Sequence, residues 1–340
     1  MINVGIVGLG FMAATHVKAY RKLSNARIAA ICNPSGRHLD GDLSRAGGNI
    51  GADDSVRLDM SQVKAFASYE SMLADPVIDL VDICAPTVAH VALAITALKA
   101  GKHVICEKPL ARTVEQARQI VEAAKRAKGF FMPAMCLRFW PQWTFLKRAI
   151  DEGSHGKILG ARFRRVAEPP GWGQKSFLDG QNSGGALFDL HVHDTDFVQF
   201  CFGRPRAVFS TGFTKVSGAI DHVVTQYQFA SGASVHAEGS WAMTPGFGFN
   251  MAYTAVFERA TVDYDLARGA EALRLFEQGQ AARTIHCEGD DGYVGELRHL
   301  IEAIQTGRPP SVVTPQDGLS SVEICAAEEK SVREGRLVEL

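Results

Sequence analysis

The sequence lacks the features that mark membrane, secreted and nucleic-acid-binding proteins. None of its apolar runs approaches the roughly 18 residues of a membrane span, and the first of them, Ile2 to Val7, has no basic leader or cleavage signal. Basic residues number 36 against 37 acidic ones, so no charge surplus exists to attract nucleic acid or a membrane surface. We therefore expect a cytoplasmic protein that binds neither.

Cysteine pairs at metal-site or redox-motif spacing are also missing. The seven cysteines are scattered without a CxxC pattern, and most end or interrupt apolar segments, where a reduced thiol packs as a small hydrophobic group. This pattern argues against a disulfide framework and a zinc ribbon, and we expect no metal site. The chain has no internal repeat, and its 340 residues suffice for about two domains.

In the first 134 residues, short β-branched runs alternate with helix-like segments. This alternation is typical of βαβ units in an α/β domain with a parallel sheet. Residues 34–61 are rich in Gly, Asp and Ser, and we expect a loop with a short helix there. The expected strands are Ile2–Val7, Ile28–Cys32, Ile78–Cys84, His103–Cys106 and Phe130–Ala134, and the expected helices are Met12–Leu23, His90–Ala100 and Val114–Lys128, the last with Thr113 as N-cap.

Longer strand-like runs begin near Lys157, and Ala230-Ser231-Gly232 reads as a hairpin turn between two of them. We expect a first domain of residues 1–134 and a second, α+β domain of residues 135–340 with a large, mostly antiparallel open sheet. The expected strands are Ile158–Val166, Ala207–Thr214, His222–Phe229, Ala233–Trp241 and Ala252–Glu258, and the expected helices are Pro141–Glu152, Tyr293–Thr306 and Pro315–Glu334.

A glycine turn follows the first expected strand and opens the first expected helix. Its sequence, Gly8-Leu9-Gly10-Phe11-Met12-Ala13, matches GxGxxA. The first glycine permits a tight turn, the second lets the backbone approach a pyrophosphate, and the alanine lets helix and strand pack closely. The helix N-terminus offers free N–H groups and a positive dipole to phosphates. We expect this Rossmann turn to bind NAD(P) through Gly8, Gly10, Phe11 and Met12.

The end of the second strand bears on the choice between NAD and NADP. An NAD site usually has an acidic residue there to accept from the ribose 2′-OH, whereas this chain has Asn33. An amide tolerates a hydroxyl or a phosphate, and the nearby Ser35 and Arg37 suit a 2′-phosphate. We expect all three to contact the cofactor, with NADP slightly favoured. The alternative is that Arg37 is a solvated loop charge.

Glu107-Lys108-Pro109 closes the apolar run His103 to Cys106. This order places an ammonium group where a buried strand opens into a crevice, and a lysine there can take part in chemistry. Most isolated Lys-Pro pairs only end a strand, because proline has no N–H to continue a ladder. The glycine turn upstream favours the catalytic interpretation of Lys108.

The segment after Gly184-Gly185 has apolar residues at helical spacing. On a helix Asp189 and His193 lie four residues apart and share a face with Asp196, so a carboxylate can orient an imidazole that points into a cleft. His191 then faces elsewhere. A competing interpretation makes His191 and His193 a metal-binding pair on a strand, but helical spacing separates them and no further ligand cluster is evident.

These residues together resemble the glucose-fructose oxidoreductase and inositol dehydrogenase family (Gfo/Idh/MocA). The resemblance covers nearly the whole chain. It rests on Gly8-Leu9-Gly10, Cys84-Ala85-Pro86-Thr87 with His90, Glu107-Lys108-Pro109, Gly184-Gly185 to Asp196, and the closing helix from Asp317-Gly318 to Gly335-Arg336-Leu337-Val338.

The resemblance implies a dinucleotide-binding domain and an α+β substrate domain whose open sheet forms homodimers or homotetramers. It implies hydride transfer between nicotinamide and a carbinol or carbonyl carbon of a sugar, polyol or derivative. The catalytic set maps to Lys108, Asp189 and His193. We also assign cofactor contacts to motif residues Pro86, Thr87, His90, Glu107 and Lys108. Asn33 departs from the family pattern and so leaves the dinucleotide open.

Oxidation of an alcohol needs a proton acceptor at the hydroxyl. We assign this role to His193, with Asp189 fixing its tautomer and Lys108 stabilising alkoxide charge; Lys108 as the base is the alternative. The expected substrate contacts are Trp172, Arg138, Lys175 and His191. Two other functions stay open: an NAD-assisted lyase, hydrolase or epimerase without net redox change, and a non-catalytic dinucleotide-binding regulator.

Overall fold

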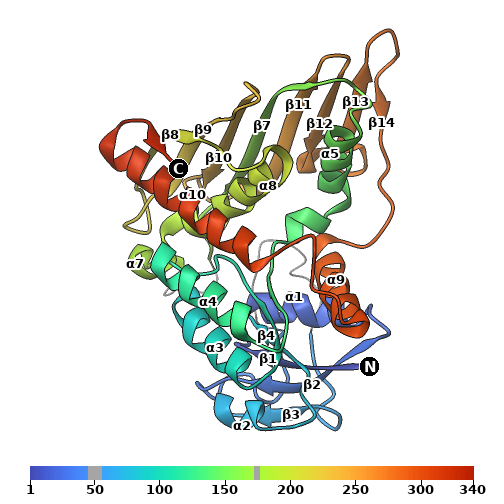
Figure 1. Ribbon diagram of the computed structural model, residues 1–340, viewed down its shortest axis with the longest axis vertical. Helices are drawn as coiled ribbons and strands as arrows, with labels where there is room; N and C mark the ends of the chain where they lie inside the picture. Colours follow the sequence, from blue (N-terminus) through green and yellow to red (C-terminus); the bar gives the residue numbers. More distant parts are fainter. Residues whose placement is uncertain (45–55, 172–176) are drawn as a thin grey trace. The chain divides into compact units, whose positions relative to one another are not determined.

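A computed structural model describes residues 1–44, 56–171 and 177–340 of the chain. The described chain divides into two compact units (Figure 1). The first contains residues 1–136 and the later segment 291–319, and the second contains most of the remainder. Residues 291–319 are expected in the second domain but group with the first unit, because a helix in this segment packs on the first helix of the chain.

The sheet of the first unit is parallel throughout, with strand order β3-β2-β1-β4-β5-β6. The inner strands β1, β4 and β5 are largely buried, which explains their near-continuous runs of aliphatic residues. The order reverses between β1 and β4, the switch point at which open α/β sheets bind ligands. The strands are β1 (Ile2–Val7), β2 (Ala26–Cys32), β3 (Lys64–Phe66), β4 (Leu80–Ile83), β5 (His103–Cys106) and β6 (Phe131–Pro133).

Helices α1 (Phe11–Tyr20) and α9 (Gly292–Thr306) pack together, as do α3 (Thr87–Lys99) and α4 (Val114–Arg126) (Figure 1). The Thr113 side chain accepts a hydrogen bond from the Gln116 amide, so the predicted N-cap of α4 is confirmed. Gly101 follows α3 with φ of 76°, a backbone conformation that suits glycine after a helix.

The second unit is built on a nine-stranded sheet, order β14-β13-β12-β11-β7-β10-β9-β8-β15, antiparallel except where β7 pairs with β10. The predicted fold class is therefore confirmed. Ala230-Ser231-Gly232 lies between antiparallel β9 and β10, as expected for a hairpin. The strands are β7 (Ile158–Ala167), β8 (Ala207–Phe213), β9 (His222–Gln228), β10 (Ser234–Ser240), β11 (Phe249–Phe257), β12 (Ala260–Asp265), β13 (Leu273–Glu277), β14 (Arg283–Thr284) and β15 (Val338–Glu339).

One face of this sheet packs against helices in a core centred on Trp143, whose ring contacts Phe163, Phe197 and Tyr253. Within the described part of the chain, no helix combines the length and hydrophobicity needed to cross a bilayer. The remaining helical elements are α2 (Tyr69–Leu73), η1 (Cys136–Phe139), α5 (Pro141–Glu152), α7 (Gly180–Ser183), η2 (Leu187–His191), α8 (Val192–Phe202), η3 (Leu266–Glu271) and α10 (Pro315–Glu334).

The stretch 34–61 differs in part from its prediction. Its described residues contain an isolated bridge between Asp42 and Arg57 and no helix, while residues 45–55 lie outside the described chain. The bridge is antiparallel and closes the loop before β3, which the sequence analysis did not predict.

Candidate active site

The glycine turn connects β1 to α1 at the switch point. Gly8 has φ of +85°, and a Cβ there would lie 2.6 Å from the Cα and N atoms of Ala85, so this turn requires glycine. Gly10 is exposed, and a Cβ there would meet nothing within 4 Å. The helix α1 has no side-chain cap and no acidic residue in its first turn. Its N–H groups and the open space above Gly10 therefore fit a dinucleotide pyrophosphate.

Asn33 lies at the end of β2, where it organises a local turn. Its side-chain amide donates to the Arg37 carbonyl at 2.7 Å, and its Oδ1 accepts from the Ser35 hydroxyl at 2.9 Å. Ser35 and Arg37 are exposed. The structure thus brings together the three residues that we expect to contact the adenosine ribose.

The turn after β4 adjoins the glycine turn. Pro86 is exposed and Thr87 begins α3. His90, one turn further on, is buried, and its two ring nitrogens each lie 2.9 Å from a backbone carbonyl oxygen, one of Ala85 and one of Pro109. Burial lowers the pKa of the His90 imidazole. His90 therefore connects this turn to the loop that carries Lys108.

Lys108 follows β5 at the same edge of the sheet. It is half-buried, and the Lys108-Pro109 peptide bond is cis. Glu107 is buried, with 5% of its surface exposed, and its Oε2 accepts a hydrogen bond from the Lys108 backbone N–H at 3.1 Å. Glu107 therefore holds the backbone at Lys108.

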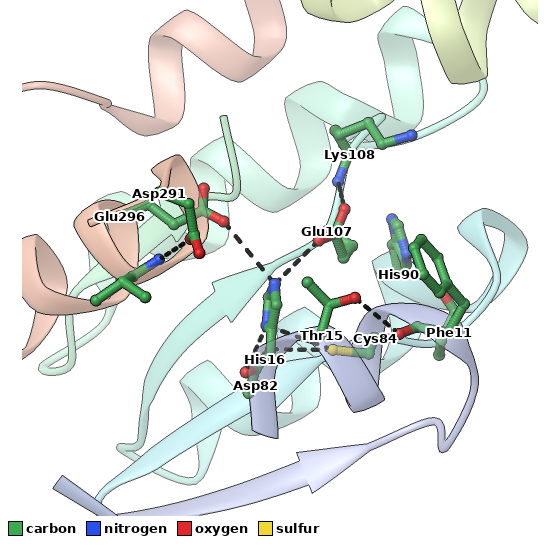
Figure 2. Close-up of polar contacts among 12 residues, drawn as sticks. Phe11, Thr15, His16, Asp82, Cys84, His90, Glu107, Lys108, Asp291 and Glu296 are labelled. Atoms are coloured by element: carbon green, nitrogen blue, oxygen red, sulfur yellow. Dashed lines mark hydrogen bonds and ion pairs between the residues drawn. The ribbon is translucent and has the colours of Figure 1, made fainter. Parts of the chain in front are cut away.

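A buried cluster of ionisable groups lies behind this edge (Figure 2). The His16 ring, on α1, is at its centre. Its Nδ1 is 2.8 Å from Asp82 Oδ2, and its Nε2 is 3.2 Å from Glu107 Oε1 and 3.8 Å from Glu296 Oε1. The Cys84 thiol adjoins the same imidazole, with Sγ 3.6 Å from His16 Nδ1. The cluster joins α1, β4, β5 and α9.

The charges of the cluster follow from its burial. Burial alone would lower the pKa of His16, but the adjacent Asp82 carboxylate and its hydrogen bond raise this pKa well above its usual value. Burial raises the pKa of Glu296 well above its usual value; His16 opposes this shift and Glu107 adds to it. Both shifts favour the protonated forms of the His16 imidazole and the Glu296 carboxyl group.

In the second unit, Asp189 and His193 lie on one continuous helical segment. Residues 187–191 form the π-helical turn η2, which continues directly into α8. Both side chains are half-buried. The predicted helix is confirmed, and the alternative that placed His191 and His193 on one face of a strand is wrong.

His191 is fully buried against the sheet. Its Nε2 lies 3.3 Å from the Tyr227 hydroxyl and 3.5 Å from Glu328 Oε1. A Cβ on Gly239 of β10 would lie 2.5 Å from the Cβ of His191, so glycine permits this approach. His191 therefore anchors the π-helical turn to the sheet and to α10.

Of the three other residues expected to contact substrate, the structure describes Arg138 alone. Arg138 is buried, and its guanidinium donates to Asp196. Asp196 is therefore engaged by Arg138 rather than exposed beside His193. Trp172 and Lys175 lie outside the described residues.

Three members of the buried cluster were not predicted from the sequence: His16, Asp82 and Glu296. His16 and Asp82 are 66 positions apart, and Glu296 comes from a helix assigned to the other domain. The sequence signal that could have revealed the cluster was a histidine and an aspartate inside apolar segments. Ionisable residues that are buried with such segments need charged or hydrogen-bonding partners.

Comparison with known proteins agrees with this architecture. Residues 2–135 match the oxidoreductase family with an NAD-binding Rossmann fold, and residues 143–263 match the GFO/IDH/MocA C-terminal domain. The chain is 27% identical to the myo-inositol 2-dehydrogenase of Thermotoga maritima, over 100% of this chain and 98% of the relative. It is 31% identical to the levoglucosan dehydrogenase of Pseudarthrobacter phenanthrenivorans, over 61% of this chain and 53% of the relative.

Solved structures share the fold along the whole chain. A levoglucosan dehydrogenase in complex with NADH and L-sorbose superposes with a TM-score of 0.85 at 24% identity, covering 99% of this chain and 98% of that chain. An aldose-aldose oxidoreductase from Caulobacter crescentus complexed with glycerol gives a TM-score of 0.84 at 23% identity, covering 100% and 99%. With both of its family domains matched, the chain belongs to the Gfo/Idh/MocA family of NAD-binding oxidoreductases.

Proposed function

We propose that this protein transfers a hydride between a nicotinamide dinucleotide and a CH–OH or carbonyl carbon of a sugar, polyol or derivative. One observation carries the proposal. The open turn at Gly10 and the half-buried Lys108 follow β1 and β5 at one edge of the parallel sheet, on either side of β4. A pyrophosphate site and a chemically competent ammonium group thus belong to one unit. The names of the inositol and levoglucosan dehydrogenases support the substrate class.

We assign catalysis to Lys108, Asp189 and His193. The bound dinucleotide supplies the carbon that accepts or donates the hydride. His193 accepts the hydroxyl proton, Asp189 fixes the tautomer of its ring, and the Lys108 ammonium group stabilises alkoxide charge. The backbone at Lys108 is held by Glu107, and the following Pro109 carbonyl is held by His90, which supports a fixed position for the lysine.

We assign dinucleotide contacts to the turns after β1, β2, β4 and β5. These residues are Gly8, Gly10, Phe11, Met12, Asn33, Ser35, Arg37, Pro86, Thr87, His90, Glu107 and Lys108. The exposed Arg37 guanidinium and Ser35 hydroxyl at the end of β2 support a slight preference for NADP.

We infer a cytoplasmic homodimer or homotetramer formed through the sheet of the second unit. The face of this sheet opposite the helices exposes large apolar side chains, namely Leu159, Phe209, Phe213, Val256 and Phe276. Such a surface suits association with a second copy of the chain. Light scattering coupled to gel filtration tests the oligomer.

The experiment is a screen of polyols and keto-sugars for absorbance change at the nicotinamide band, with NADH and NADPH in parallel, on the wild type and Lys108→Ala. We expect the variant to lose turnover by about a thousandfold while binding the dinucleotide as before. Lys99→Ala, at an exposed lysine of α3, is the control. Near-normal turnover by Lys108→Ala contradicts the assignment, and sugar conversion without net nicotinamide change indicates a lyase, hydrolase or epimerase.

A further inference from the structure

The Glu107 carboxylate connects His16 to Lys108. One oxygen, Oε1, is 3.2 Å from His16 Nε2, and the other, Oε2, accepts the Lys108 backbone N–H at 3.1 Å. Figure 2 shows that this bond reaches the Lys108 amide and not its ammonium group. Glu107 therefore contacts Lys108 at its backbone through Oε2, while Oε1 faces the His16 ring.

The His16 ring suits the task of holding Glu107 in place. It is surrounded by acidic groups from the neighbouring elements: Asp82 within β4, Cys84 just after it, Glu107 after β5, and Glu296 on α9. The Tyr20 side chain is buried nearby, and the Tyr293 ring centroid lies 6.4 Å from that of His16. A protonated imidazole carries an N–H on both nitrogens. Nδ1 lies 2.8 Å from Asp82 Oδ2, and Nε2 forms an ion pair with Glu107 Oε1 at 3.2 Å. The Asp82 bond fixes the ring, and the other nitrogen then fixes the carboxylate.

We propose that His16 is a positioning residue for the hydride-transfer site, acting on Lys108 through Glu107. This inference rests on the catalytic role of Lys108 proposed above. The effect of His16 is geometric: it holds the carboxylate that fixes the Lys108 backbone.

A matched pair of substitutions separates the two contacts of the ring. In His16→Asn the amide nitrogen takes the place of Nδ1 and can still donate to Asp82, whereas in His16→Gln it takes the place of Nε2 and can still donate to Glu107. Both variants remove the ring and its charge, so their losses of packing are comparable. The proposal expects different effects on turnover, and a purely structural role for His16 expects similar ones.

We expect His16→Asn to lower kcat by about a hundredfold with little change in the KM for dinucleotide, and His16→Gln to recover most of that loss. A second readout needs no turnover. In protein labelled with 15N at lysine, the Lys108 amide resonance should shift in His16→Asn and stay close to wild type in His16→Gln, because a hydrogen bond to a carboxylate moves an amide proton downfield.

Equal kcat losses in the two variants, or an unmoved Lys108 amide in His16→Asn, would overturn the proposal. If neither variant folds, Glu107→Gln replaces them. The proposal expects this variant to shift the Lys108 amide resonance and to lower kcat. A wild-type amide resonance together with a wild-type kcat would overturn the proposal. A stoichiometric metal ion in the purified protein also overturns it, since His16, Asp82 and Cys84 would then be ligands. If Lys108→Ala stays active, the proposed function fails separately, and the amide resonance still tests the contact.

Discussion

Arg138 and Asp196 form a buried, two-point ion pair. The Nε and Nη2 atoms of Arg138 each donate to a different oxygen of Asp196, both at 2.8 Å, and neither side chain is more than 2% exposed. Asp196 Oδ1 also accepts from the Ser321 hydroxyl on α10. The pair therefore ties the segment after β6 to α8 and α10 in the core of the second unit.

We predict that Arg138→Ala and Asp196→Ala each lower the free energy of unfolding by about 3 to 5 kcal/mol, because each leaves a buried charge without its partner. Urea denaturation measures this. The control is Arg333→Ala, which breaks an exposed pair with Glu329 on α10 and should cost at most about 1 kcal/mol. A stable Arg138→Ala variant with a raised KM for sugar would instead support the substrate contact expected from the sequence.

The bounds of strands and helices were predicted best where a single strong sequence pattern decides the local structure. The bounds of β1, β5, α5 and α10 agree with their predictions, because each apolar run or helical period ends at glycine, proline or a charged residue. Strands β3 and β12 to β15 were not predicted. They are short or carry polar residues, as in Thr261 and Asp263 of β12, and they are strands because neighbouring strands pair with them.

The candidate site was predictable only in part, for a similar reason. Gly8 and Lys108 belong to motifs of consecutive residues, so their places at the sheet edge follow from strand order. The contacts of His16 with Asp82, Glu107 and Glu296 join residues distant in sequence. They depend on the packing of α9 against α1, and no local pattern specifies that packing.

Arg37→Ala tests the dinucleotide preference. If the guanidinium binds a 2′-phosphate, the variant should lose about tenfold or more in affinity for NADPH and change little toward NADH. Nicotinamide fluorescence titration measures both affinities. Arg126→Ala, at an exposed arginine in the last turn of α4, is the control. Equal losses for the two dinucleotides would assign Arg37 to general attraction of phosphate, and no loss would make it a solvated charge.

Glu296→Gln tests the charge state of the buried cluster. Because the pKa of Glu296 is raised in the folded protein, the unfolded chain releases this proton first as pH rises. The wild type should therefore lose stability as pH increases above about 4.5, by up to about 1.4 kcal/mol per pH unit until the folded group also ionises. The amide variant lacks this loss, so its stability relative to wild type should increase with pH.

Urea denaturation of both proteins between about pH 5 and about pH 8 measures this difference. Glu302→Gln, at an exposed glutamate of the same helix, should keep a constant difference from wild type. A constant difference for Glu296→Gln as well would mean that Glu296 titrates alike in the folded and unfolded chains.

Gly8→Ala and Gly10→Ala should separate folding from cofactor binding within one turn. Gly8 has a positive φ, and its added Cβ would lie 2.6 Å from backbone atoms of Ala85, so Gly8→Ala should cost about 2 kcal/mol or more of stability. Gly10 has φ of −101° and open space at its Cβ position. Gly10→Ala should therefore leave stability within about 0.5 kcal/mol of wild type and weaken NADH binding by about tenfold or more.

Thermal denaturation and NADH fluorescence titration on both variants measure the two effects. Because the substitution is chemically the same at two positions in one turn, each variant is the control for the other. Unchanged NADH affinity in a stable Gly10→Ala protein would show that the pyrophosphate does not approach this backbone, since the added methyl group would fill the space that the phosphates need.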